Sequence, residues 1–117
     1  MTDKELLELA AKAAGIEYFW TANGNLVATA EDGKQWNPLT DDGDALRLAV
    51  KLDIAIVPYP IYERPKHSVI AKQYKDSRAV YRDERKSIEE IELHNDDPYA
   101  ATRRAIVRAA AEIGMVK

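Results

Sequence analysis

Two dipeptides, Asn23-Gly24 and Asp32-Gly33, restrict what this 117-residue chain can fold into more than any other feature of its sequence. Both favour the positive φ angles that tight hairpin turns require. Each stands between short segments with strand character, at residues 17–21, 26–30 and 35–37. The spacing therefore predicts a three-stranded antiparallel meander near the start of the chain.

Capping signals predict a helix at each end of the chain. Thr2 and Glu5 form a capping box at the start of the first helix, and Gly15 provides its C-terminal stop. Asp97, followed by a proline, begins the last helix, which carries a long apolar stripe rich in alanine. The end of this helix is expected at Gly114, because glycine readily adopts the left-handed conformation there.

A third helix is expected in the middle of the chain, over residues 45–52. The acidic run before it suits a helix N-terminus, where carboxylates cap free backbone N–H groups. The spacing of apolar residues gives it an amphipathic character. The side chains available for burial are Leu46, Ala49, Val50 and Leu52.

The remaining segments predict further strands. Residues 54–57 form a short strand, and Pro58 and Pro60 exclude it from the centre of a sheet because proline lacks a backbone donor. Residues 69–74 and 78–82 alternate as the arms of a hairpin. Residues 83–95 are expected to be irregular, and two alternatives stay open within them: a short helical turn capped by Ser87, or a strand over residues 91–93. The chain is thus predicted to be one α+β domain, residues 1–117: an antiparallel sheet, meander plus hairpin, packed with helices as an α-β-α sandwich.

Composition excludes several classes of site. The chain has no cysteine, so disulfides, thiolate nucleophiles and cysteine-bound metals are excluded. No signal sequence or membrane-length apolar run is present, which predicts a cytoplasmic protein. His67 and His94 are 27 residues apart and lie in no metal-binding or catalytic motif, and phosphate-binding glycine loops are absent. We therefore predict no catalytic residue, no metal ligand and no cofactor.

The acidic run is the one segment that suggests a metal-dependent alternative. Asp41, Asp42 and Asp44 could offer oxygen ligands to a hard cation such as Mg²⁺ or Ca²⁺. The calcium-loop pattern is incomplete, however, because Leu52 stands where the closing glutamate would be expected. Helix capping accounts for the same residues, so a small metal-dependent enzyme at residues 41–44 is an alternative hypothesis only.

Two segments are candidates for binding a macromolecule. The proline-rich loop over residues 58–66 combines reduced flexibility with residue types common at binding hot spots, so it is the predicted partner site. Residues 63–86 contain eight Lys/Arg and four Asp/Glu, although the whole chain has a net charge of −3. The basic hairpin over residues 66–86 could follow a nucleic-acid backbone, with arginines of the last helix adding to it. The partner-site residues are Tyr59, Tyr62, Arg64 and Lys66, and the nucleic-acid residues are Lys72, Lys75, Arg78 and Arg82.

Two stretches resemble a known group of small proteins. Residues 36–49, WNPLTDDGDALRLA, and residues 97–114, DPYAATRRAIVRAAAEIG, are similar to segments of uncharacterised phage and prophage proteins that carry a phage α-β-α sandwich domain. The resemblance implies a phage or prophage origin and a compact sandwich, and it assigns no catalytic or binding residues. The leading prediction is a non-enzymatic phage accessory protein that binds a host or phage macromolecule, and self-association into a homo-oligomer is also plausible.

Overall fold

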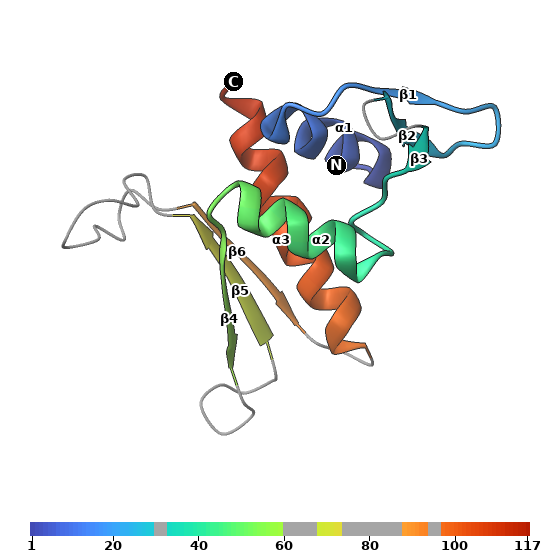
Figure 1. Cartoon of the computed structure of the whole chain (residues 1–117). Coiled ribbons are helices and arrows are strands. Elements are labelled where there is room, and N and C mark those ends of the chain that lie inside the picture. Colours follow the sequence, from blue (N-terminus) through green and yellow to red (C-terminus); the bar gives the residue numbers. More distant parts are fainter. Residues whose placement is uncertain (30–32, 60–67, 74–87, 94–96) are drawn as a thin grey trace.

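A computed structural model describes residues 1–29, 33–59, 68–73, 88–93 and 97–117, and it has an α+β fold (Figure 1). The described part contains three helices and two antiparallel sheets of three strands each. This confirms the predicted fold class. The elements are α1 (Asp3–Ala14), β1 (Tyr18–Trp20), β2 (Leu26–Ala28), β3 (Lys34–Gln35), α2 (Asp42–Lys51), β4 (Ala55–Tyr59), β5 (Ser68–Gln73), β6 (Ile88–Leu93) and α3 (Pro98–Met115).

The predicted caps of the terminal helices are confirmed. The Thr2 hydroxyl accepts the backbone N–H of Glu5 at 3.2 Å, and Gly15 ends α1 with a φ of 69°. Asp97 caps α3 by accepting the backbone N–H groups of Tyr99 and Ala100, each at 3.0 Å. These carboxylate and hydroxyl oxygens satisfy donors that a helix leaves unpaired at its start.

The first sheet is the predicted meander, in the order β1-β2-β3. Its first turn is closed by two hydrogen bonds between Thr21 and Asn25, with Gly24 at a φ of 82°. Trp36 follows β3, and its backbone N–H donates to Leu26 at 2.9 Å. Its side chain is 6% exposed, so the meander is anchored to the core at this point. Asp32 of the second predicted turn lies outside the described residues.

The second sheet differs from the prediction, because β5 is its central strand and pairs with both β4 and β6. The hairpin predicted between residues 69–74 and 78–82 is therefore wrong for β5, since both of its edges are occupied; residues 78–82 lie outside the described ranges. Residues 88–93 form strand β6, so the strand alternative for residues 91–93 is confirmed and the helical turn is not found there. Pro58 lies in β4, an edge strand of the described sheet and not its centre, as predicted.

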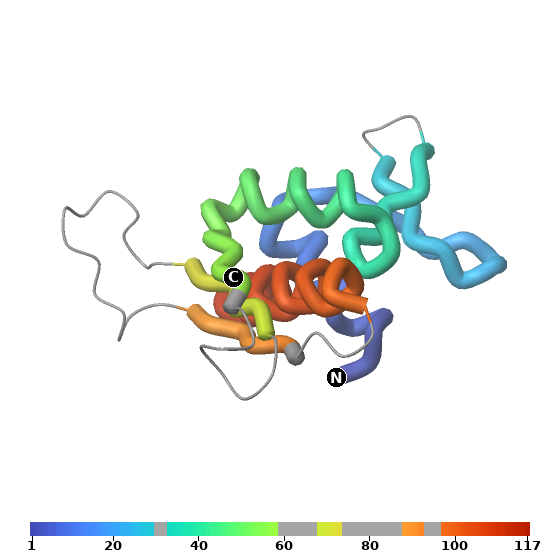
Figure 2. Tube along the Cα trace, turned by 90° about the horizontal axis from the view of Figure 1, so that it is seen from below, coloured from blue at the N-terminus to red at the C-terminus, as the bar shows by residue number. Residues whose placement is uncertain are grey.

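Helix α3 lies at the centre of the packing. Figure 2 shows it between α2 and the β5–β6 strands, and α1 packs along its C-terminal half (Figure 1). Val69 and Ala71 of β5 contribute to the same core. The α3 residues Ala105, Val107, Ala109 and Ala110 have no exposed surface.

Gly114 does not end α3, contrary to the prediction. It is an internal, buried residue of the helix. A Cβ atom at this position would overlap the carbonyl oxygen of Leu9 in α1. Glycine is therefore needed here for the close approach of two helix backbones and not for a left-handed turn.

Candidate interaction surface

The predicted partner loop is only partly covered by the structure. Tyr59 is the last residue of strand β4, so the backbone there is part of the sheet and not of an exposed loop. It pairs with Ser68 of β5. Tyr62, Arg64 and Lys66 lie outside the described residues, as do His67 and His94. The loop hypothesis therefore stays a prediction.

The basic hairpin contributes one described residue, Lys72 of β5. Its ammonium forms an ion pair with Glu89 of β6 at 3.1 Å, and its side chain is only 12% exposed. Burial and pairing leave little of this charge available to an external phosphate. Lys75, Arg78 and Arg82 lie outside the described residues.

The α3 arginines that were expected to extend a nucleic-acid surface are all paired with carboxylates. Arg103 contacts Asp42 at 2.6 Å, and Arg104 contacts Asp3 at 3.0 Å. Arg108 lies 2.8 Å from each of two glutamates of β6, Glu90 and Glu92. These arginines tie α3 to the elements around it.

The acidic run is used in the same way, for capping and pairing. Asp41 accepts the backbone N–H of Asp44 at 2.8 Å, and so caps α2. Asp44 accepts the backbone N–H of Asn37 at 2.9 Å and the Arg47 guanidinium at 2.8 Å. Within the part of the chain that the structure covers, no group of three or more acidic or histidine side chains is arranged to hold a metal ion.

The glutamates beside Arg108 border a hollow of about 490 Å³ between the start of α1, β6 and α3. Partial burial raises the pKa of Glu90 above its ordinary value of 4.5; the Arg108 charge opposes this shift, and a hydrogen bond with Glu112 adds to it. The hydrogen bond to Glu92 raises the pKa of Arg108. The hollow is lined by three carboxylates and two guanidinium groups, so its charges largely compensate one another. One of the guanidinium groups, that of Arg104, lies 3.5 Å from Glu92. Through Arg108, the arrangement links α3 to β6.

Helix α2 presents a different kind of surface, because it has apolar residues on two faces. Its inner face is buried and consists of Ala45, Leu48 and Ala49, continued by Leu52 after the helix. Leu46 and Val50, one turn apart on the outer face, are 59% and 69% exposed. The prediction that these two side chains are buried is wrong, since the neighbours of α2 cover only the inner face.

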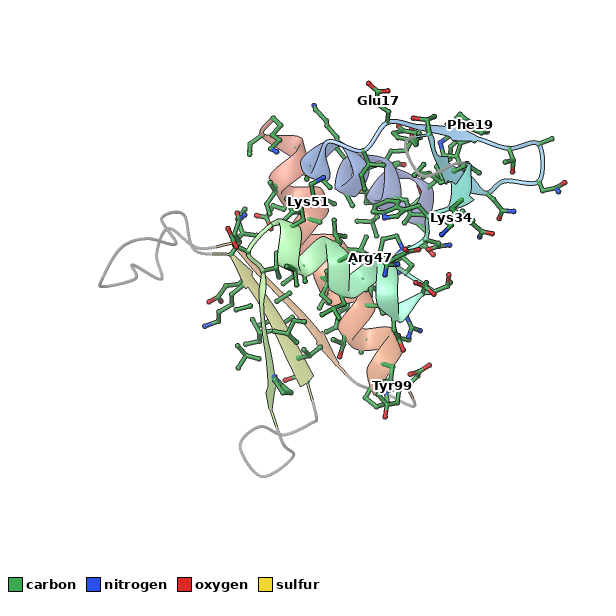
Figure 3. All side chains as sticks on the ribbon, in the orientation of Figure 1. Glu17, Phe19, Lys34, Arg47, Lys51 and Tyr99 are labelled. Atoms are coloured by element: carbon green, nitrogen blue, oxygen red, sulfur yellow. The ribbon has the colours of Figure 1, made fainter. Side chains whose placement is uncertain are left out.

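Arg47, labelled on α2 in Figure 3, is also exposed and is held in place by neighbouring carboxylates. Its guanidinium is held by Asp44 at 2.8 Å and by Asp41 at 3.8 Å. Two of its nitrogens lie 3.1 Å from where a Cβ of Gly43 would be, so the missing side chain at Gly43 leaves room for it. Its side chain is nevertheless 69% exposed. The outer face of α2 thus combines two exposed aliphatic side chains with an ordered, accessible cation.

This surface was missed in the sequence because six of the eight residues from 45 to 52 are apolar. Such a run covers most of the helix circumference and does not identify which face is buried. One signal was present: Leu46 and Val50 are four residues apart, as a single stripe requires.

Comparison with known proteins adds no assignment. No protein-family model matches the chain, and no curated protein or solved structure matches it either. Among the helices that the structure describes, none has both the length and the apolar character needed to cross a bilayer.

Proposed function

We propose that this protein is a non-enzymatic binding protein that contacts a macromolecular partner through the outer face of α2. The observation that carries the proposal is the exposure of Leu46 and Val50 on a well-capped helix whose opposite face is fully packed. Complete burial of one such side chain contributes about 1.5–3 kcal/mol. A partner that covers both would therefore gain a substantial apolar contribution.

Arg47 supports the same assignment. Arginine is enriched at binding hot spots, and ordering a long side chain on association costs about 0.5–1.5 kcal/mol. Because Asp41 and Asp44 already hold the guanidinium, part of that cost is met within the free protein. The described cations of the nucleic-acid alternative are also paired with carboxylates, but their side chains are less exposed than that of Arg47, so a protein partner is favoured.

The resemblance of residues 36–49 and 97–114 to small phage and prophage proteins supplies a biological setting for this proposal. In that setting the protein acts as a phage accessory factor in the cytoplasm of a bacterial host. Residues 42–49 of the first stretch belong to α2, so the stretch that carries the resemblance also contributes Leu46 and Arg47 to the proposed surface.

Site-specific photo-crosslinking in the producing cell tests the proposal. A photoreactive amino acid replaces Leu46 or Val50 in turn, and a third protein carries it at the exposed residue Glu17 as a matched control. We expect a discrete crosslinked product from positions 46 and 50, and a markedly lower yield from position 17. The mass of the product identifies the partner.

The yields at the three positions decide the result. If positions 46 and 50 give no more product than position 17, the outer face of α2 is not a binding surface and the proposal is wrong. A product from all three positions at equal yield would likewise contradict it, because the contact would then be unspecific.

A further inference from the structure

We infer that the hollow between the start of α1, the β1–β2 turn and the turn before α2 binds a small aromatic carboxylate. The hollow measures about 400 Å³, and its described lining includes no residue of α2, so the inference is independent of the proposed function. Small-molecule sites are typically of this size, and they combine an apolar lining with a few placed polar groups. Here the apolar lining comes from Leu7, Trp20 and Leu39, and the polar groups come from Lys4 and Asn37.

One wall of this hollow, at Asn37 and Leu39, is held in place by hydrogen bonds. The backbone N–H of Asn37 donates to the Asp44 carboxylate at 2.9 Å, and the Asn37 side-chain oxygen accepts the backbone N–H of Leu39 at 3.0 Å. The carbonyl of Leu39 in turn accepts the Arg103 guanidinium at 2.9 Å, which ties the wall to α3. The wall is therefore formed before a ligand arrives, and this lowers the entropic cost of binding.

The polar groups of the lining that lack a partner are donors. Because the Asn37 side-chain oxygen is used by Leu39, its amide nitrogen is left over, and it donates to no described residue. The Lys4 ammonium forms no ion pair with a described carboxylate and lies 5.3 Å from the centroid of the Trp20 ring. The Trp20 indole N–H is buried and has no acceptor in the described part of the chain, so a ligand reaches it only if the ring turns slightly. A ligand that suits this set supplies acceptor oxygens.

The charges around the hollow favour an anionic ligand over a cationic one. Asp3 is the carboxylate of the described lining, and the Arg104 guanidinium already contacts it at 3.0 Å. With this pair mutually compensated, the exposed ammonium of Lys4 supplies the remaining charge. A ligand ammonium would be repelled by Lys4, whereas a ligand carboxylate would gain a charge-assisted hydrogen bond from it.

Trp20 determines the apolar part of the ligand. Tyr18 meets the indole edge to face, with ring centroids 6.3 Å apart, and Lys4 lies over the ring. The attraction between an exposed lysine and an aromatic ring is weak, and a charge-assisted hydrogen bond to a carboxylate is stronger. The ammonium can therefore leave the ring for the carboxylate of a ligand. The indole face that it uncovers suits a planar aromatic ring.

The two tryptophans provide the test, because each indole N–H gives its own NMR signal and Trp20→Phe assigns them. Trp20 lines the hollow, whereas Trp36 is buried and is not among its described lining residues. Phenylacetate is the probe, and phenylacetamide is a neutral control of the same shape. We expect phenylacetate to shift the Trp20 signal saturably, with a dissociation constant on the order of 1 mM, and to leave the Trp36 signal in place. Phenylacetamide should bind about tenfold more weakly.

Removal of the Lys4 charge separates recognition of the carboxylate from general effects. Lys4→Met should weaken the binding of phenylacetate about tenfold and leave that of phenylacetamide unchanged, because the amide carries no charge for the ammonium to meet. Lys12→Met is the matched control: Lys12 is an exposed residue in the last turn of the same helix and is not among the described lining residues. This variant should bind phenylacetate as wild type does. An unchanged Trp36 signal shows that each variant is folded.

Three results would overturn the inference. Absence of a saturable shift at Trp20 up to about 10 mM phenylacetate would exclude the site. Equal affinities for phenylacetate and phenylacetamide would exclude recognition of a carboxylate. Equal losses in Lys4→Met and Lys12→Met would show that the net charge of the protein, and not this hollow, attracts the anion. None of these results bears on the outer face of α2, which the crosslinking experiment tests separately.

Discussion

Helix α3 is held on two sides by different physical means. On the side of α1 the contact depends on shape: small residues allow the helices to approach until Gly114 lies against the Leu9 backbone. On the side of β6 the contact depends on charge, with Arg108 placed between Glu90 and Glu92. The first contact should respond to added volume and hardly to pH or salt, and the second should do the reverse. Substitutions on each side can test this difference.

Of the substitutions that test the two sides of α3, Gly114→Ala is expected to have the largest effect on stability. A methyl group there would overlap the Leu9 carbonyl, and overpacking of a close contact costs about 1–3 kcal/mol, with rigid backbone at the upper end. We expect the free energy of unfolding to fall by about 3 kcal/mol in urea denaturation. Gly15→Ala is the matched control, because its φ of 69° imposes strain of about 1 kcal/mol in open space. Equal losses in the two variants would show that the helices are not in close contact.

Removal of Arg108, the cation between α3 and β6, should lower the free energy of unfolding by less than Gly114→Ala does. Arg108→Met removes the cation from Glu90 and leaves Glu92 with Arg104 alone, and the Arg108 side chain is 36% exposed, so solvent screens part of the loss. We expect stability at pH 7 to fall by about 1–2 kcal/mol in urea denaturation. The loss should shrink in high salt, where the wild-type ion pairs are weakened too. Lys34→Met, at an exposed residue, controls for the general effect of removing a cation. A loss that does not change with salt would mean that packing, and not charge, dominates this side.

The sequence predicted the parts of the fold that local chemistry determines. Thr2 and Asp97 cap their helices as expected, and glycine at position 24 adopts the positive φ of a turn. Gly114 was misread because a glycine that ends a helix and one that admits a neighbouring backbone look alike until the neighbour is known. The first role is local and the second depends on a residue more than one hundred positions away.

The same limit applies to the second sheet and to the candidate site. The pairing of β5 with β4 and β6 spans connections of eight and fourteen residues, longer than the tight turns that local residue patterns identify, and residues 69–74 are locally compatible with a hairpin as well. On α2, the sequence could not separate Leu46 from Leu48, since both belong to a nearly continuous apolar run. Only the arrangement of α2 on α3 decides that Leu48 is 3% exposed and Leu46 is 59% exposed.

The pH dependence of stability should distinguish the charged side of α3 from the apolar one. Because burial raises the pKa of Glu90 in the folded protein above 4.5, the folded state holds its proton more tightly than the unfolded state. The associated stability is fully present below pH 4.5 and is lost as the pH rises through the raised value. Glu90→Gln removes this loss, so the melting temperature of the variant should fall less than that of wild type over this range.

Glu17→Gln is the control for Glu90→Gln, because Glu17 is an exposed carboxylate outside the charged contact. Thermal unfolding followed from about pH 4 to pH 7 would cover the relevant window. Parallel curves for wild type and Glu90→Gln would contradict the raised pKa. A steeper fall for the variant would mean that the attraction of Arg108 outweighs burial and the Glu112 contact.

The smallest effect on stability is expected at the outer face of α2, which neither shape nor charge ties to α3. Leu46→Ala should change the free energy of unfolding by less than about 0.5 kcal/mol when measured at low protein concentration. Leu48→Ala, two residues away on the inner face, should lower it by about 2–5 kcal/mol. Urea denaturation of both variants at a low protein concentration of about 1 μM keeps any association from adding to the measured stability. If Leu46→Ala were as damaging as Leu48→Ala, Leu46 would belong to the core, and the surface proposed for a partner would have no apolar group to offer it.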